Sequence, residues 1–169
     1  TRLRHLQQYP RKDSKHAHRY FGGLAILVRT RANPGIKVLP VENSEIMWIK
    51  LDKHFFHLPF DIFLANVYIC PTYSTFRERN VDIFDLLETN LAKYSSYGQC
   101  IVTGDFNART NTENDFLSQN LNCLTLCSTS LSDPILPTRR NMDTSQTDRN
   151  GKDLLDLCRT ASLRIVNGR

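Results

Sequence analysis

The chain has 169 residues, which suits one domain, and 40% of them are hydrophobic, enough to bury a core. Its 22 Lys and Arg exceed its 17 Asp and Glu, so the net charge is +5. No apolar run approaches the roughly 20 residues of a membrane span. The polar, basic start is unlike a signal peptide, so we expect an intracellular protein with reduced cysteines and no membrane partner.

The positive charge is concentrated at the start of the chain. Residues 1–31 hold eight Lys and Arg against one Asp, a charge of +7, which leaves −2 for the remainder. Such a segment favours a polyanionic partner such as nucleic acid, and it is equally typical of a solvated, flexible terminus. Because residues 1–20 show no hydrophobic periodicity, we expect a basic arm or loop there and one domain over residues 21–169.

The first half of this domain has the pattern of successive strands. We expect strands at residues 24–28, 36–40, 46–51 and 61–69, joined by short connections. Short connections are typical of antiparallel pairing. The continuous apolar run at residues 24–28 indicates a central strand that is covered on both faces.

Helices enter in the second half. Asn80 is a plausible N-cap for a helix whose apolar face carries Val81, Phe84, Leu87 and Leu91. A strand at residues 100–103, a long irregular segment at 110–149, a helix at 152–161 and a strand at 163–166 complete the expected order. A loop as long as 110–149 is usually functional or mobile.

Residues 99–109 (QCIVTGDFNAR) form the candidate site. A buried strand reaches Gly104, where glycine permits a sharp turn. If the chain stays extended beyond it, Asp105 and Asn107 project together into solvent and Phe106 projects toward the core. The alternative is an Asx-type turn, which these residues often form. No Ser/His/Asp order, phosphate-cradling glycine loop or HExxH motif is present.

Three segments together resemble a known superfamily. They are residues 22–28 (GGLAILV), residues 66–68 (NVY) with Pro71 after them, and residues 103–109 (TGDFNAR). The set is similar to the endonuclease/exonuclease/phosphatase superfamily, the fold of deoxyribonuclease I and apurinic endonuclease. Residues 150–158 and 163–168 resemble, more narrowly, the endonuclease domain of non-LTR (LINE-type) retrotransposon polyproteins. The resemblance spans about residues 20–169.

The resemblance implies an α/β (α+β) fold, a four-layer sandwich of two mixed, mainly antiparallel sheets flanked by helices. The family has strands ending in Asn and in a metal-binding Glu before the glycine-rich strand, and a Ser-Asp-His segment at its end. This sequence contains neither the strands ending in Asn and in Glu before residue 22 nor the Ser-Asp-His segment, so we expect a domain truncated at both ends. The resemblance also implies a Mg²⁺- or Mn²⁺-dependent DNA endonuclease that hydrolyses a phosphodiester, joined to a reverse transcriptase domain and nuclear if it acts on chromosomal DNA.

The family's roles transfer to matching positions of this sequence. Asp105 would orient or deprotonate the attacking water. Asn107 would hold a phosphate oxygen or help that water, and Tyr68 would contact the scissile phosphate. Asp105 and Asn107 would also be metal ligands, without the family's main Glu. Arg109, placed just beyond the tip, is our own additional candidate for a clamp on the nucleic-acid backbone.

Other functions remain open at this point. A phosphoinositide or sphingomyelin phosphodiesterase of the same fold shares the Gly-Asp-x-Asn tip, although the retrotransposon-like tail argues against it. A non-catalytic nucleic-acid-binding module is a third reading, since the expected Glu and His are missing. A decayed coding fragment is the fourth.

Overall fold

The computed structural model describes residues 3–7, 11–12, 20–21, 23–40, 43–71, 82–116 and 145–167. The chain divides into two compact units, residues 1–107 and 108–169, and each has its own architecture. In the described ranges, no helix combines the length and apolar composition needed to cross a bilayer.

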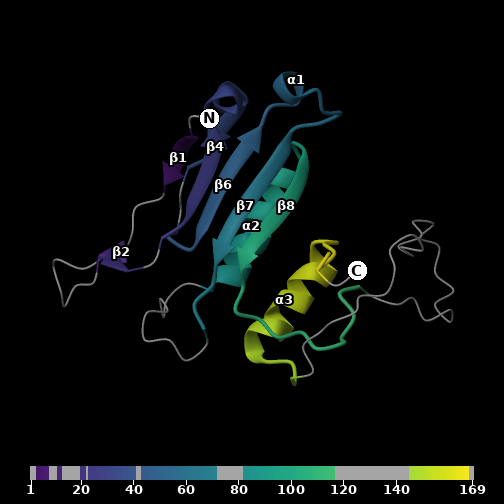
Figure 1. Ribbon diagram of the computed structural model, residues 1–169. Coiled ribbons are helices and arrows are strands. Elements are labelled where there is room, and N and C mark those ends of the chain that lie inside the picture. The colour runs from purple at the N-terminus through teal and green to yellow at the C-terminus, as the bar shows by residue number, and fades with distance from the viewer. Residues whose placement is uncertain are drawn as a thin grey trace, which may run out of the picture. The chain divides into compact units, whose positions relative to one another are not determined.

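The first unit contains a four-stranded mixed sheet (Figure 1). Its order is β5 (Ile36–Val38), β6 (Ile46–Leu51), β7 (Ile62–Tyr68) and β8 (Gln99–Asp105). The pairs β5–β6 and β6–β7 are antiparallel, as the short connections predicted, and β7–β8 is parallel. A parallel pair needs a long crossover, and the segment containing α2 (Ile83–Ser95) provides it.

Helix α2 covers one face of this sheet. Its amphipathic pattern buries Leu87 completely, and the ring of Tyr94 stacks on Phe63 with 5.1 Å between ring centroids. Asp82 caps the helix by accepting a hydrogen bond from the Phe84 N–H at 2.9 Å. The predicted helix is therefore confirmed with a later start, while Asn80, the expected cap, lies outside the described residues.

The opposite face of the sheet packs against residues of β4 (Ala25–Arg29) and the residue before it. Leu24 is buried in a cluster with Met47 and Ile49, and Ile26 packs against that cluster. On the outer side of β4, Leu27 is 59% exposed. The expectation that residues 24–28 are covered on both faces is therefore wrong.

The expectation of a structureless arm over residues 1–20 is also wrong in part. Strand β1 (Leu3–Gln7) pairs antiparallel with β4, and β2 (Arg11–Lys12) pairs antiparallel with β3 (Tyr20–Phe21). The β1–β4 ladder joins separate segments through backbone hydrogen bonds, and two-residue strands such as β2 and β3 are too short to show a hydrophobic period.

The second unit is built on α3 (Arg149–Thr160), which buries Leu155, Leu157 and Cys158. The helix begins three residues before the predicted start. Asp148 caps it there, because its side chain accepts a hydrogen bond from the Gly151 N–H at 2.7 Å. The strand expected at residues 163–166 is absent from the described structure. There the Ile165 N–H donates to Asp115 Oδ2 at 2.6 Å, a side-chain partner that replaces a strand neighbour.

Two short helices close the end of the sheet at which β6 ends and β7 begins. They are the 3₁₀ helix η1 (Thr30–Gly35) and α1 (Lys53–Phe56). The carboxylate of Asp61 fixes the connection from α1 to β7, because it accepts from the Lys53 N–H at 2.9 Å and pairs with Lys50 Nζ at 2.7 Å.

Asp61 should make the stability of the first unit depend on pH. The hydrogen bond from Lys50, and then that from the Lys53 N–H, lower the pKa of Asp61 below its ordinary value. The ionised Asp61 carboxylate therefore stabilises the folded state at pH values above the pKa that Asp61 has in the unfolded chain, about 4. This stabilisation is lost as the pH falls through the lower pKa of Asp61 in the folded state. Asp61→Asn keeps the acceptor oxygen but removes the charge, so we expect the free energy of unfolding to fall at neutral pH. The loss should be only about 1 kcal/mol, because the ion pair is partly exposed to solvent. Urea unfolding at pH 7 and pH 3 should show this difference shrinking in acid, and a pH-independent difference would contradict it.

Candidate functional site

Tyr68 and Asp105 lie side by side at the ends of β7 and β8. They are paired in the parallel register, and just beyond them the Ile69 N–H donates to the Asp105 carbonyl oxygen at 2.9 Å. Every second residue of β7 is buried, including Phe63 and Val67, and Phe63 contacts α2 by stacking on Tyr94. Tyr68 has the opposite parity, so it and Asp105 project from the face away from α2. Both side chains are exposed at this sheet end.

The backbone turns sharply after Asp105. Asn107 has a left-handed φ of 45°, and its N–H donates to Asp105 Oδ1 at 2.9 Å. The extended arrangement expected for these residues is therefore wrong, and the Asx-type turn is the one that forms. The Asn107 side chain also points back to the sheet, since Nδ2 donates to the Ile69 carbonyl oxygen at 2.9 Å. The amide is thus held against the end of β7, beside Asp105.

Gly104 allows β7 and β8 to approach at this point. Its φ is 128°, and a Cβ added there would lie 1.9 Å from the Val67 carbonyl oxygen. The strand continues through Gly104 to Asp105, whereas the sequence suggested that it ends there. Among the described strands β8 lies at the edge of the sheet, and Ile101 is 41% exposed, so the expectation of a buried strand is wrong. Partial burial raises the pKa of the Cys100 thiol, which keeps it protonated and a poor nucleophile.

Glu45 is a residue of this sheet end that the sequence reasoning missed. It directly precedes β6, is buried, and accepts the Tyr68 N–H through its carbonyl oxygen at 2.9 Å. Its own N–H donates to Asn43 Oδ1 at 2.6 Å. No motif singled out Glu45 in the sequence, but an antiparallel register between 46–51 and 62–68 would have placed Glu45 opposite Tyr68.

Arg109 belongs to the second unit. Its N–H donates to Asp148 Oδ1 at 3.0 Å, its carbonyl oxygen accepts from the Asp148 N–H at 3.2 Å, and its side chain is exposed. The structure thus brings Tyr68, Asp105 and Asn107 together within the first unit, and it places Arg109 on the backbone framework of the second.

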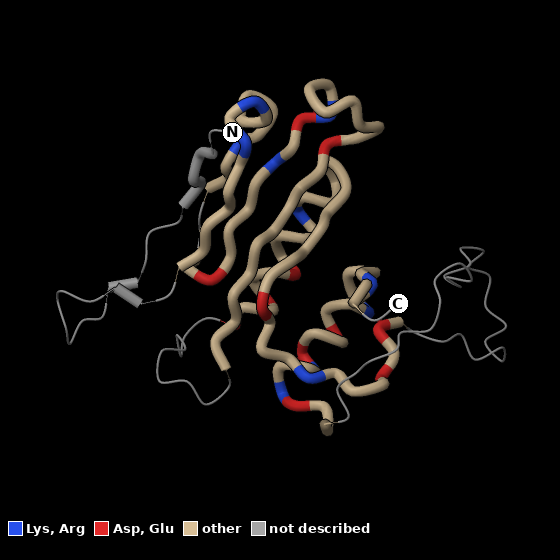
Figure 2. Tube along the Cα trace, viewed as in Figure 1, with Lys and Arg blue, Asp and Glu red and all other residues tan. Residues whose placement is uncertain are grey.

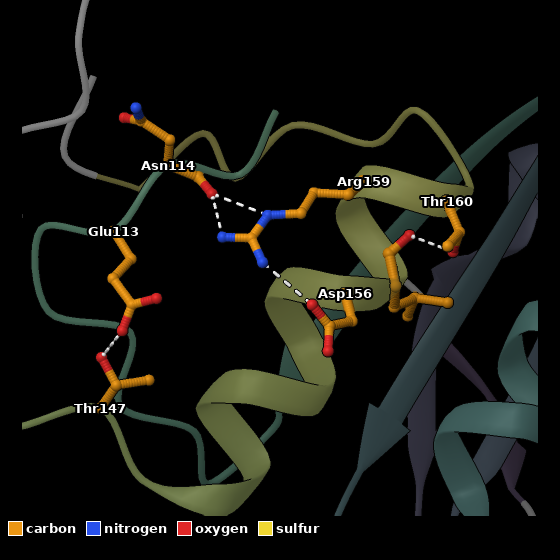
Figure 3. Close-up of polar contacts among 7 residues, drawn as sticks. Glu113, Asn114, Thr147, Asp156, Arg159 and Thr160 are labelled. Carbon is orange, nitrogen blue, oxygen red and sulfur yellow. Dashed lines mark hydrogen bonds and ion pairs between the residues drawn. The ribbon is translucent and has the colours of Figure 1, made fainter. Parts of the chain in front are cut away.

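Further contacts within the second unit join residues 113–114 to residues 147–159. Arg159 donates from Nη2 to the Asn114 carbonyl oxygen at 2.9 Å and pairs with Asp156 at 2.9 Å (Figure 3). Thr147 donates its hydroxyl to the Glu113 carboxylate. The contacts of Asn114 and Glu113 hold residues 109–115 against residues 147–159, whereas the Arg159–Asp156 pair lies within α3.

Asp148 should be the most important polar side chain of this framework. Asp148→Ala removes both the α3 cap and the partner of the Arg109 N–H, so we expect a loss of about 2 kcal/mol in the free energy of unfolding. The matched variant Asp156→Ala removes an exposed carboxylate from the same helix and should cost under about 0.5 kcal/mol. Urea denaturation of both variants measures the difference, and equal losses would contradict the capping role.

A divalent ion is a partial fit to the residues at the sheet end. Magnesium is usually bound by one or two carboxylates together with several waters. The exposed carboxylate of Asp105 suits one such ligand. Among the described residues, no group of three or more His, Cys, Asp or Glu forms an all-protein cage.

Fold and site together define a mixed α/β protein that carries a phenol, a carboxylate and an anchored amide at one end of its main sheet. Comparison with known proteins gave no match to a protein-family model, to a curated protein or to a solved structure.

Proposed function

We propose that this chain is part of a metal-dependent phosphodiesterase, a DNA endonuclease of the retrotransposon type that nicks DNA by water attack on a phosphodiester. One observation carries the proposal: Tyr68 and Asp105 are register partners at the sheet end, with the Asn107 amide fixed beside them. A carboxylate can orient or deprotonate water, and a phenol and an amide can donate hydrogen bonds to phosphate oxygens, so this reaction can use all three groups.

Each residue has a role that its contacts support. The Asn107 N–H holds Asp105 Oδ1, which fixes the carboxylate for orienting or deprotonating water. The exposed Tyr68 hydroxyl would donate to a phosphate oxygen. Asn107 positions Asp105 and would add an amide contact to the phosphate. Arg109 would clamp the nucleic-acid backbone. A Mg²⁺ or Mn²⁺ ion, with Asp105 as one ligand, would neutralise charge on the phosphate.

The proposed architecture is the four-layer sandwich of the resembled superfamily. The main sheet has α2 on one face and β4 on the other, and β4 is paired with β1. In this proposal the β1–β4 ladder belongs to the second sheet. The exposure of Ile101 and Leu27 supports further layers over β8 and over the outer side of β4 in the whole domain. A reverse transcriptase domain in the same polyprotein and a nuclear location follow from the same proposal.

Nicking of supercoiled plasmid tests the function. The 169-residue chain and a version extended at both ends with its flanking coding sequence are incubated with Mg²⁺, Mn²⁺ or EDTA. We expect nicking by the extended version with either metal, none in EDTA, and little by the shorter chain. Silence of the extended version on DNA, with hydrolysis of phosphoinositide or sphingomyelin vesicles, would move the reaction to a lipid substrate. Salt-dependent DNA binding without any cleavage would replace the proposal by a binding module.

A further inference from the structure

We infer that the end of the first unit opposite the candidate site binds single-stranded nucleic acid, through exposed aromatic rings set among cations. We call it the basic aromatic end and define it by η1, α1, the connection from α1 to β7, and the turn between α2 and β8. This inference goes beyond the proposed nuclease and does not depend on it.

The strand register places this end far from Asp105. Leu51, the last residue of β6, pairs with Ile36 and with Ile62, the first residue of β7. Tyr68, which pairs with Asp105, is the last residue of β7. The seven residues of β7 separate the two ends by about 20 Å.

Three of the four most exposed aromatic side chains in the described part of the chain lie at this end. They are Phe55 at 43%, Phe60 at 44% and Tyr97 at 71% exposure; the fourth is Tyr68. Exposed aromatic rings that gather in one region mark an interaction surface more often than scattered ones do. Unpaired bases stack on such rings whatever their sequence.

The Phe55 ring is packed against its neighbours, and the backbone beside Phe60 is anchored. Phe55 lies so close over Gly35 that a Cβ there would meet its ring at 2.2 Å, and the Phe55 and Phe56 rings are T-shaped with 4.9 Å between centroids. Phe60 immediately precedes Asp61, which is held by Lys53 and Lys50. A ring that is already fixed loses little conformational entropy on binding, so its stacking contributes more fully to affinity.

The charge of the first unit is sorted along the sheet. All six described Lys and Arg of residues 23–107 lie toward the basic aromatic end, as the blue segments of β4, β6, η1 and α1 show (Figure 2): Arg29, Arg31, Lys37, Lys50, Lys53 and Lys93. Among the residues that the structure describes, two carboxylates lie at this end. Asp52 caps α1, and Asp61 pairs with Lys50, so this pair engages one carboxylate and one of the six cations.

Acidic side chains mark the opposite end in the part of the chain that the structure describes. Glu45 and Asp105 adjoin Tyr68, and Asp82 precedes the first turn of α2. Phosphates would therefore be attracted to the basic aromatic end and repelled from the other in the absence of a metal. Exposed His54 and His57 add further donors beside the rings.

Cations alone would attract duplex and single strands alike, but the rings select unpaired bases. In a duplex the faces of the bases are already stacked on one another and closed to a protein ring. DNA and RNA single strands both offer free base faces next to phosphates, so the shared chemistry is a phosphate chain with unstacked bases.

The test is fluorescence anisotropy of labelled oligothymidylate and oligouridylate of about 12 nucleotides, with a duplex of equal length, in EDTA. Removing the rings with Phe55→Ala and Phe60→Ala together should weaken single-strand binding at least about tenfold. It should leave duplex binding and the salt dependence unchanged. The conservative pair Phe55→Tyr and Phe60→Tyr should retain binding, which separates loss of stacking from a folding defect.

The cations are tested by a matched pair of double variants. Arg31→Gln with Lys37→Gln should weaken binding of both strand types and lower the salt slope by about 1.4 for single strands. Arg149→Gln with Lys152→Gln removes the same charge from exposed positions of α3 and should change little. Equal effects of the two double variants, unchanged binding by the ring variants, or equal affinity for an abasic strand would each overturn the inference.

Repeating the titration with Asp105→Ala should leave binding intact even where nicking is lost, so the failure of one proposal is distinguishable from that of the other.

Discussion

Asp105→Ala is expected to slow the Mg²⁺-dependent nicking of plasmid by the extended protein by about 10²–10⁴-fold. This is the range for loss of a positioned general base, and removal of a metal ligand acts in the same direction. The carboxylate lies at the end of β8 beside Tyr68 and is oriented by the Asn107 N–H at 2.9 Å. Single-turnover nicking with saturating protein measures the chemical step apart from DNA binding.

Two further variants separate chemistry from structure. Asp105→Asn keeps an oxygen that accepts from the Asn107 N–H but carries no charge. It should therefore lose nicking almost as fully as the alanine variant while its free energy of unfolding stays within about 0.5 kcal/mol of the parent. Asp156→Ala, at an exposed position of α3, is the matched control and should nick normally. Full activity of Asp105→Asn would show that the carboxylate only shapes the turn.

Gly104→Ala should cause the largest loss of stability of any conservative change in the first unit, about 4 kcal/mol. Alanine is strained at a φ of 128°, which contributes about 1–3 kcal/mol. Its Cβ would also lie 1.9 Å from the Val67 carbonyl oxygen, which forces β7 and β8 apart. Since single domains are stable by only about 5–15 kcal/mol, this one methyl group should remove a large part of the total. Urea unfolding monitored by circular dichroism measures the loss.

The neighbouring residue supplies the control for Gly104. Thr103 is exposed on the same strand, so Thr103→Ala should cost under about 1 kcal/mol. If Gly104→Ala unfolds at the same urea concentration as Thr103→Ala, then β8 does not approach β7 as described. Gly104→Ala should also abolish nicking in the extended protein, because Tyr68 and Asp105 would no longer be neighbours.

The strands whose hydrophobic pattern is local were predictable. Residues 46–51 form β6 with the expected bounds, and residues 61–69 contain β7, because one face of each is buried under α2 and the other under β4. Pairing between distant segments was not predictable. β1 has no periodic apolar pattern and joins β4 through its backbone, and the parallel partner of β7 comes from beyond α2.

The candidate site was predictable in its residues and only partly in its geometry. The spacing of Asp105 and Asn107 indicated a polar tip after a strand, and Tyr68 was expected at a strand end. The Asx-type turn at Asn107 is local and was one of the two sequence alternatives, whereas its bond to Ile69 is a contact with another strand, which spacing alone does not contain. Glu45 was missed for the same reason, since only the register shows it beside Tyr68.

The order of the main sheet also has a kinetic consequence. The strands β5, β6 and β7 follow one another and close through short connections, whereas β8 returns to β7 only after the whole α2 crossover. Pairings between distant segments form late, because loop closure must precede the contacts that stabilise it. The neighbourhood of Tyr68 and Asp105 is therefore expected to arise in the last folding step of this sheet. In that order of events, the β5–β6–β7 meander forms with η1, α1 and the connection from α1 to β7. Pairing of β8 then brings in the turn after α2 and completes the candidate active site.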